Sequence, residues 1–125
     1  MTKAAAIYQF WSSFNLTAYE ENEVPTGDDK PAFPYLTYEF ATDGWMGVIP
    51  LSASLWYRSE SWKAANAKAE EISAYIGLGG VFLKCDGGYI HIRRGSPFAQ
   101  NMGDTSNDLI KRKYINVIAE FLTAN

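Results

Sequence analysis

The sequence predicts an α+β domain in which two helices pack on a mostly antiparallel, twisted sheet of about four to six strands. Two densely aromatic, β-rich runs, residues 33–40 and 48–57, flank a short glycine-bearing connection, as in a pair of antiparallel strands. Two other segments carry apolar side chains at helical spacing, and an Asp-Gly turn joins two further alternating runs. The expected order is helix, strand, strand, helix and then three strands.

Length and composition indicate one domain covering residues 1–125 that builds its core without a metal or a disulfide. The chain has 125 residues, and its lone cysteine, Cys85, permits no intramolecular disulfide. Aromatic residues make up 15%, and Tyr and Trp are enriched at protein interfaces, so the composition favours a protein that packs against a partner. A net charge of −3 provides no overall basic field for nucleic acid.

We expect a chain that is made and folded in the cytoplasm. No apolar run approaches the roughly 20 residues that a membrane span needs. The first residues, MTKAAA, lack the apolar core and cleavage site of a signal peptide.

The first helix is expected over residues 3–14, with Thr2 as its N-cap. The apolar residues of its predicted buried stripe are Ile7, Phe10, Trp11 and Phe14, at i, i+3, i+4 and i+7. This aromatic face suits packing on a sheet, although binding to a partner is an alternative. Residues 15–32 contain prolines, a glycine and clustered acids, which indicate a loop with one short strand near residues 17–19. The acids do not follow the spacing of a calcium loop and are expected to be solvated.

The strand pair should have one buried face on each strand. The residues expected to face the core are Leu36, Tyr38 and Phe40 in the first strand, and Leu51, Ala53, Leu55 and Tyr57 in the second. Pro50 should lie at a bulge, bend or edge because it cannot donate a ladder hydrogen bond. Trp45 and Met46 are large apolar residues at the tip of the connection, where solvent is expected, and are therefore candidates to contact a neighbour.

A second helix should begin after a cap at Ser59 or Ser61 and end near Ile76, before Gly77 and Gly79. Its predicted buried stripe is Trp62, Ala65, Ala69, Ile72 and Ile76. The sequence Asp-Gly-Gly at residues 86–88 then predicts a hairpin turn between strands at 81–85 and 89–93.

Residues 95–108 are polar and rich in turn formers and are expected to form a long loop, with Phe98 and Met102 as its isolated apolar residues. A last strand is expected from about Ile110 to Leu122. One of its faces consists of Lys113, Ile115, Val117, Ala119 and Phe121. The basic pairs and runs at residues 93–94 and 111–113 could form a nucleic-acid patch, but a solvated strand face is the favoured interpretation.

The sequence offers little catalytic chemistry, and we do not expect an enzyme. Glycine-rich phosphate loops, His-Glu-x-x-His, Cys-x-x-Cys and Gly-x-Ser-x-Gly are all missing from it. Cys85 and His91 lie on the two arms of the predicted hairpin. A nucleophile–base pair would need an activated thiolate and an orienting third group, so a buried thiol and a surface imidazole are the expected roles.

Three strings of the sequence, taken together with the order of elements, resemble the tail terminator (tail completion) proteins of long-tailed bacteriophages, a family of phage neck proteins. The strings are AYEENEVP at residues 18–25, FPYLTY at 33–38 and RKYINVIAEFL at 112–122. The likeness covers most of the chain in element order. Other neck proteins, such as the stopper, are similar in size and partly in fold.

The resemblance implies a structural virion protein at the tail–head junction, assembled in the host cytoplasm. Such a subunit would form a ring, typically a homo-hexamer, on the end of the tail tube. The ring would stop tube polymerisation and provide the docking surface for the head connector or stopper, with DNA passing through its lumen. No cofactor, metal or membrane is implied. The candidate subunit or tube interface residues are Trp45, Met46, Phe98 and Met102.

Two other functional classes remain open at the level of sequence. A small ligand- or peptide-binding module would use the aromatic sheet face as a platform and would not need to oligomerise. An enzyme would need a convergent polar site near His91 or Cys85.

Overall fold

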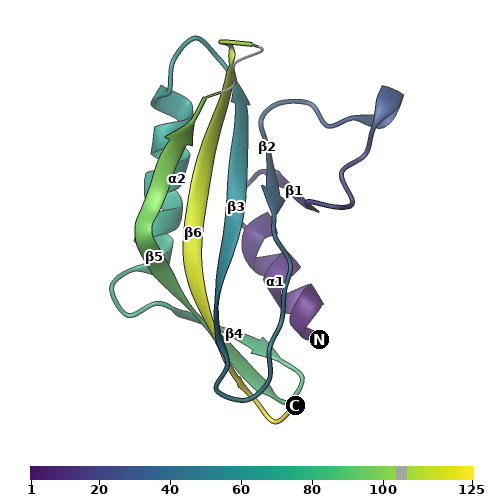
Figure 1. Ribbon diagram of the computed structural model, residues 1–125, viewed down its shortest axis with the longest axis vertical. Coiled ribbons are helices and arrows are strands. Elements are labelled where there is room, and N and C mark those ends of the chain that lie inside the picture. The colour runs from purple at the N-terminus through teal and green to yellow at the C-terminus, as the bar shows by residue number, and fades with distance from the viewer. Residues whose placement is uncertain (104–106) are drawn as a thin grey trace.

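The computed structural model describes residues 1–103 and 107–125, and these residues confirm the α+β fold class (Figure 1). They form two α-helices, one short 3-10 helix and one six-stranded sheet. In chain order the elements are α1 (Lys3–Ser12), β1 (Thr17–Glu20), η1 (Gly27–Asp29), β2 (Tyr35–Tyr38), β3 (Val48–Arg58), α2 (Lys63–Ile76), β4 (Val81–Cys85), β5 (Gly88–Met102) and β6 (Ile110–Thr123).

The long strands β3, β5 and β6 are the frame of the sheet. The spatial order is β1-β2-β3-β6-β5-β4, and every neighbouring pair is antiparallel except β1 and β2, which are parallel. β3 and β6 pair over their full common length, from Val48 opposite Glu120 to Arg58 opposite Ile110. The predicted mostly antiparallel sheet is therefore confirmed, and the short strand expected near residues 17–19 is β1, at one edge.

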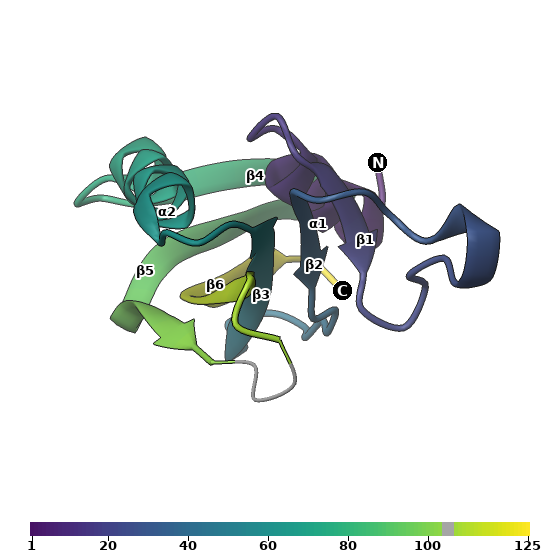
Figure 2. The same ribbon diagram turned by 90° about the horizontal axis from the view of Figure 1, so that it is seen from above.

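The sheet curls strongly, and α1 lies where its two edges approach each other. β1 and β4 are at opposite ends of the strand order, yet both contact α1 (Figure 2). The Thr2 hydroxyl accepts a hydrogen bond from the Ala5 amide, so Thr2 is the N-cap that the sequence predicts. The N-terminal ammonium group also donates to the Asp86 carboxylate at 2.9 Å, which ties the start of α1 to the β4–β5 turn.

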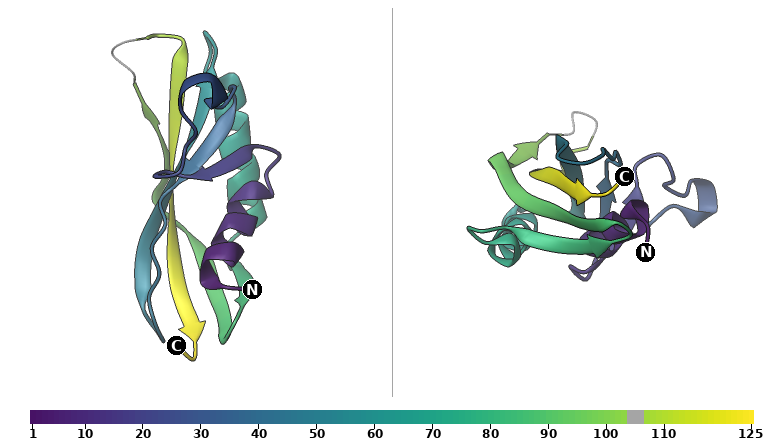
Figure 3. Two further views of the ribbon diagram at one scale, coloured as in Figure 1. Left: turned by 90° about the vertical axis from the view of Figure 1, so that its right-hand side faces the viewer. Right: turned by 90° about the horizontal axis from the view of Figure 1, so that it is seen from below.

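Both helices lie on the same side of the sheet, with α2 packed over β3, β5 and β6 (Figure 3). The core lies between the helices and this concave face. The alternation of β6 is confirmed, because Ile115, Val117, Ala119 and Phe121 are all buried. Within residues 1–103 and 107–125, no helix lies on the other face of the sheet, and we call this side the helix-free face.

The predicted loop at 95–108 is wrong over residues 95–102, where β5 continues as a strand. This half of β5 pairs with β6, from Ala99 opposite Ile115 to Met102 opposite Arg112. The turn-forming residues are absorbed by an irregularity in the ladder between Arg94 and Ala99, which is how a bulge accommodates residues that fit no regular strand. Residues 104–106 of the predicted loop lie outside the described residues.

Two smaller expectations are also corrected, and the predicted end of α2 is confirmed. β2 ends at Tyr38, and Phe40, which alternation placed in the core, is exposed on the irregular chain beyond it. The N-cap of α2 is Trp62, without a side-chain cap, while the Ser61 hydroxyl accepts from the Lys63 amide. Gly77 follows the helix at φ 68°, as a glycine C-cap should.

Candidate contact surfaces

The connection between β2 and β3 presents two large apolar side chains on a firmly held backbone. Trp45 and Met46 are 64% and 61% exposed, as the sequence predicts. The Met46 amide donates to the Phe121 carbonyl at 2.7 Å, and the Phe121 amide donates to the Gly47 carbonyl at 2.9 Å. Met46 has φ 63°, a left-handed conformation that persists only where the surroundings enforce it. The loop is thus built to display apolar surface with little conformational freedom to lose on binding.

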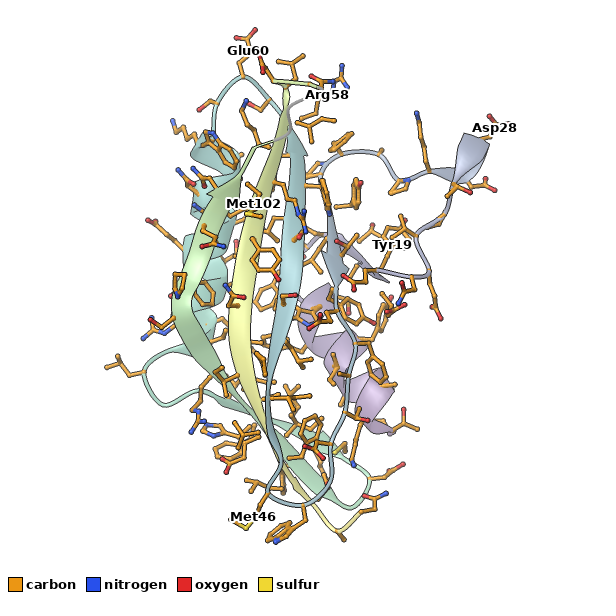
Figure 4. All side chains as sticks on the ribbon, in the orientation of Figure 1. Tyr19, Asp28, Met46, Arg58, Glu60 and Met102 are labelled. Atoms are coloured by element: carbon orange, nitrogen blue, oxygen red, sulfur yellow. The ribbon has the colours of Figure 1, made fainter. Side chains whose placement is uncertain are left out.

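The other two predicted contact residues do not join this surface. Phe98 and Met102 lie on the second half of β5, and Figure 4 shows Met102 far from Met46 along the sheet. Both are half-buried, and Phe98 packs against the core. Their side chains are covered because residues 95–102 form a strand, whereas the sequence analysis expected a loop. The four candidates therefore divide into one exposed pair and two separate packing residues.

The helix-free face carries a row of aromatic side chains that crosses three strands. Tyr35 on β2 stacks on Trp56 of β3, with ring centroids 6.1 Å apart and planes at 14°. The Arg112 guanidinium of β6 lies over Trp56 at 5.0 Å and over Tyr114 at 5.5 Å, and its Nε donates to the Ser54 hydroxyl. Alternation in the sequence puts Tyr35, Trp56 and Arg112 opposite the core faces of their strands, but it does not show that they form a row. Only the cross-strand register makes them neighbours.

A second cluster lies across β4, β5 and β6, also on the helix-free face. His91 stacks on Phe82 with centroids 4.3 Å apart, and its Nδ1 lies 4.0 Å from a Glu120 carboxylate oxygen. The His91 Nε2 is 2.8 Å from the Gly79 carbonyl, in position to donate to it. His91 is thus half-buried, contrary to the predicted surface position, and its contact with the Gly79 carbonyl holds the chain before β4 in place.

Cys85 and His91 do not form a nucleophile–base pair. Cys85 is buried on the core side of β4, as expected for a packing thiol. His91 is on β5 opposite Phe82, whose exposed side chain points to the helix-free side. The sheet therefore separates the thiol from the imidazole.

The basic runs are divided in the same way by strand alternation. Arg112 belongs to the helix-free face, whereas Lys113 on the other face donates to Asn66 of α2 and Asn101 of β5. Arg94 donates to the Ser73 hydroxyl of α2. Adjacent basic residues thus point to opposite sides, so the two runs do not build one continuous patch.

The acidic segment between β1 and β2 projects from the sheet and bounds an open groove. Asp28 marks its tip in Figure 4, at η1. The groove between this segment and the sheet has a volume of about 780 Å³. Its lining is mainly apolar and includes Pro25, Pro31, Ala32, Phe33, Tyr35 and Ile110. Lys30, Arg58 and Asp28 supply its charges. Across the described parts of the chain, no group of three or more His, Cys, Asp or Glu side chains is placed to hold a metal.

Three tyrosines of the sheet titrate above their ordinary range. Burial raises the pKa of Tyr35, with Tyr19 adding to the effect, and burial together with Glu71 raises that of Tyr57. Burial also raises the pKa of Tyr38, and the carboxylates of Glu20 and Glu23 raise it further. These phenols are therefore neutral at physiological pH.

Comparisons of the chain with protein-family models, curated proteins and solved structures find no match. Within residues 1–103 and 107–125, no helix has the length and apolar character of a membrane span.

Proposed function

We propose that this chain is a structural subunit of the phage neck, a tail terminator that forms a ring on the end of the tail tube. The ring stops tube polymerisation and offers its other side to the head connector. The resemblance in the strings at 18–25, 33–38 and 112–122 suggests this class. An α+β fold with one face left open suits a subunit that is completed by neighbours.

The observation that carries the proposal is the chemical difference between the two ends of the long sheet. One end displays Trp45 and Met46 on the anchored β2–β3 loop, and the other end carries the charged side chains Arg58 and Glu60 (Figure 4). A terminator must bind the tube on one side and the head connector on the other. We assign the apolar end to the tube, because buried apolar residues dominate stable protein contacts.

The test uses the tail tube protein encoded in the same genome. Added chain should arrest tube growth, seen as tubes that stop lengthening in electron micrographs and in light scattering. The double substitution Trp45→Ser with Met46→Ser should raise the concentration needed for arrest by about tenfold or more. Leu109→Ser, which alters an exposed apolar residue near the other end, is the control and should cap normally. A chain that never binds tube ends would contradict the proposal.

A peptide-binding module is the second candidate, and the row of Tyr35, Trp56 and Tyr114 favours it. Such a module would bind its ligand as a monomer and lose affinity on Trp56→Ala, while tube growth in its presence would continue. Binding to the head connector without any effect on tube ends would instead indicate another head–tail joining protein.

A further inference from the structure

The α2–β4 connection displays an isolated leucine on a rigid support. Leu78 is 97% exposed within the sequence Gly-Leu-Gly-Gly at residues 77–80. Gly80 has φ 78°, and a Cβ there would lie 2.5 Å from the Ile92 carbonyl oxygen, so the chain is closely packed under the loop. The Gly79 carbonyl is also held by His91 at 2.8 Å.

Two further apolar side chains flank this leucine in the chain. Tyr75 in the last turn of α2 and Phe82 on β4 are 56% and 60% exposed and line a common cavity beside α1. Tyr75 packs on Phe10 and Phe14 of α1, and Phe82 stacks on His91, so neither side chain covers the leucine. We call Leu78, at the tip of the connection, the knob. Because Leu78 is almost fully exposed, burial against a partner would remove nearly all of its apolar surface from water.

The groove beside the acidic segment is on the opposite flank of the molecule. In Figure 1 the α2–β4 connection projects on one side of the sheet, and the segment with η1 projects on the other. A subunit with an apolar projection on one flank and an apolar groove on the other has the two different surfaces that a heterologous, ring-closing contact requires.

We propose that the knob of one copy docks into the groove of the next copy. The charges of the two surfaces agree with this arrangement. On the knob side, Arg94 donates to Ser73 of α2, and the Arg93 side chain lies against Gly80. On the groove side, the projecting segment carries Asp28 and Asp29 in η1, so the basic flank of one copy would face the acidic segment of the next. The inference deepens the proposed ring and rests on that proposal for its closure.

The sheet edges are poorer candidates for joining copies. The edge strands β1 and β4 have only four and five residues, and the part of β5 beyond its pairing with β4 contains Pro97, which lacks an amide donor. Short strands and prolines are devices that prevent edge pairing. A contact through side chains at the flanks avoids both obstacles.

A complementation experiment tests the contact. Leu78→Asp destroys the knob, and Ala32→Trp fills the groove at a residue that is exposed in the monomer. Each variant alone should assemble at least about tenfold more weakly than the original chain by light scattering. An equimolar mixture should form a one-to-one dimer and nothing larger, because each pair keeps only one intact contact. Tyr8→Ser, outside both surfaces, should assemble normally.

Disulfide trapping covers the case of a weak contact. A chain with Leu78→Cys and Ala32→Cys should give a ladder of multimers after oxidation at high protein concentration, whereas either single substitution should not. Absence of the ladder, or normal assembly of Leu78→Asp, would overturn the contact. Neither outcome depends on the tube assay: a chain that forms the ladder but never caps tubes would retain the contact and lose the proposed function.

Discussion

At the scale of single residues, Tyr38 links burial to pH dependence. Burial, and then Glu20 and Glu23, raise the pKa of its phenol above the ordinary value near 10. Above about pH 10 the unfolded chain loses this proton before the folded chain does, so the free energy of unfolding falls until the folded pKa is passed. Tyr38→Phe should make that fall smaller. Urea titrations at several pH values measure the free energy of unfolding of both proteins. The difference between their free energies should be constant between about pH 7 and pH 9. If the unfolding free energies of the two proteins fell equally above pH 10, the role of Tyr38 would be contradicted.

The exposure of individual residues was predicted correctly only where a tight connection made it inevitable. Trp45 and Met46 stand out because the chain must reverse between two strands within a few residues. Phe98 was misplaced because Gly95 and Pro97 resemble loop residues, while tertiary pairing with β6 holds them in a strand. Leu78 was passed over, although a leucine among three glycines just after a helix is a recognisable signal of exposure.

At the scale of elements, Gly95 is what allows the second half of β5 to approach β6. A Cβ at this position would lie 2.9 Å from the Asn116 carbonyl oxygen, an atom of the backbone that cannot swing away. We expect Gly95→Ala to destabilise the protein by about 1–3 kcal/mol through overpacking. Gly103→Ala is the matched control, since a Cβ there meets no atom of the described residues within 4 Å, and it should stay within about 0.5 kcal/mol. Equal free energies of unfolding for Gly95→Ala and the original chain, measured by chemical denaturation, would show that β5 and β6 can shift at this position without cost.

Elements with a strong period were predictable, and those that depend on pairing were not. The stripe that predicted α2 consists of Trp62, Ala65, Ala69, Ile72 and Ile76. The last four are buried, whereas Trp62 is half-buried at the N-cap. The alternation of β6 was equally clear. The short strand expected near residues 17–19 is present as β1, but no local pattern indicated its parallel pairing with β2. The groove depends on the path of the chain between these two strands, and local sequence patterns do not predict that path.

At the scale of the whole molecule, the sheet order brings together segments that are remote in sequence. β3 pairs with β6 across the α2 and hairpin region, and the resulting curl brings both edge strands to α1. Local periodicity reports which side of an element is buried but carries no information on which elements meet. The sequence therefore predicts the number of strands, but not the curl of the sheet or the position of α1.

The position of α1 makes a prediction about the whole fold. Trp11 is 1% exposed in the core cluster, on the helix that contacts both β1 and β4. Trp11→Ala should cost about 3–5 kcal/mol, because it leaves a large cavity where the two edges of the sheet approach each other. Amide hydrogen exchange should then accelerate in β1 and β4 more than in β3 and β6, whose ladder is continuous without α1. Tyr8→Ala, on the exposed side of the same helix, should alter neither the stability nor the exchange pattern by much. Equal acceleration of amide exchange in all six strands would mean that α1 and the whole sheet unfold as one unit. It would contradict a specific role of α1 in holding the two edge strands.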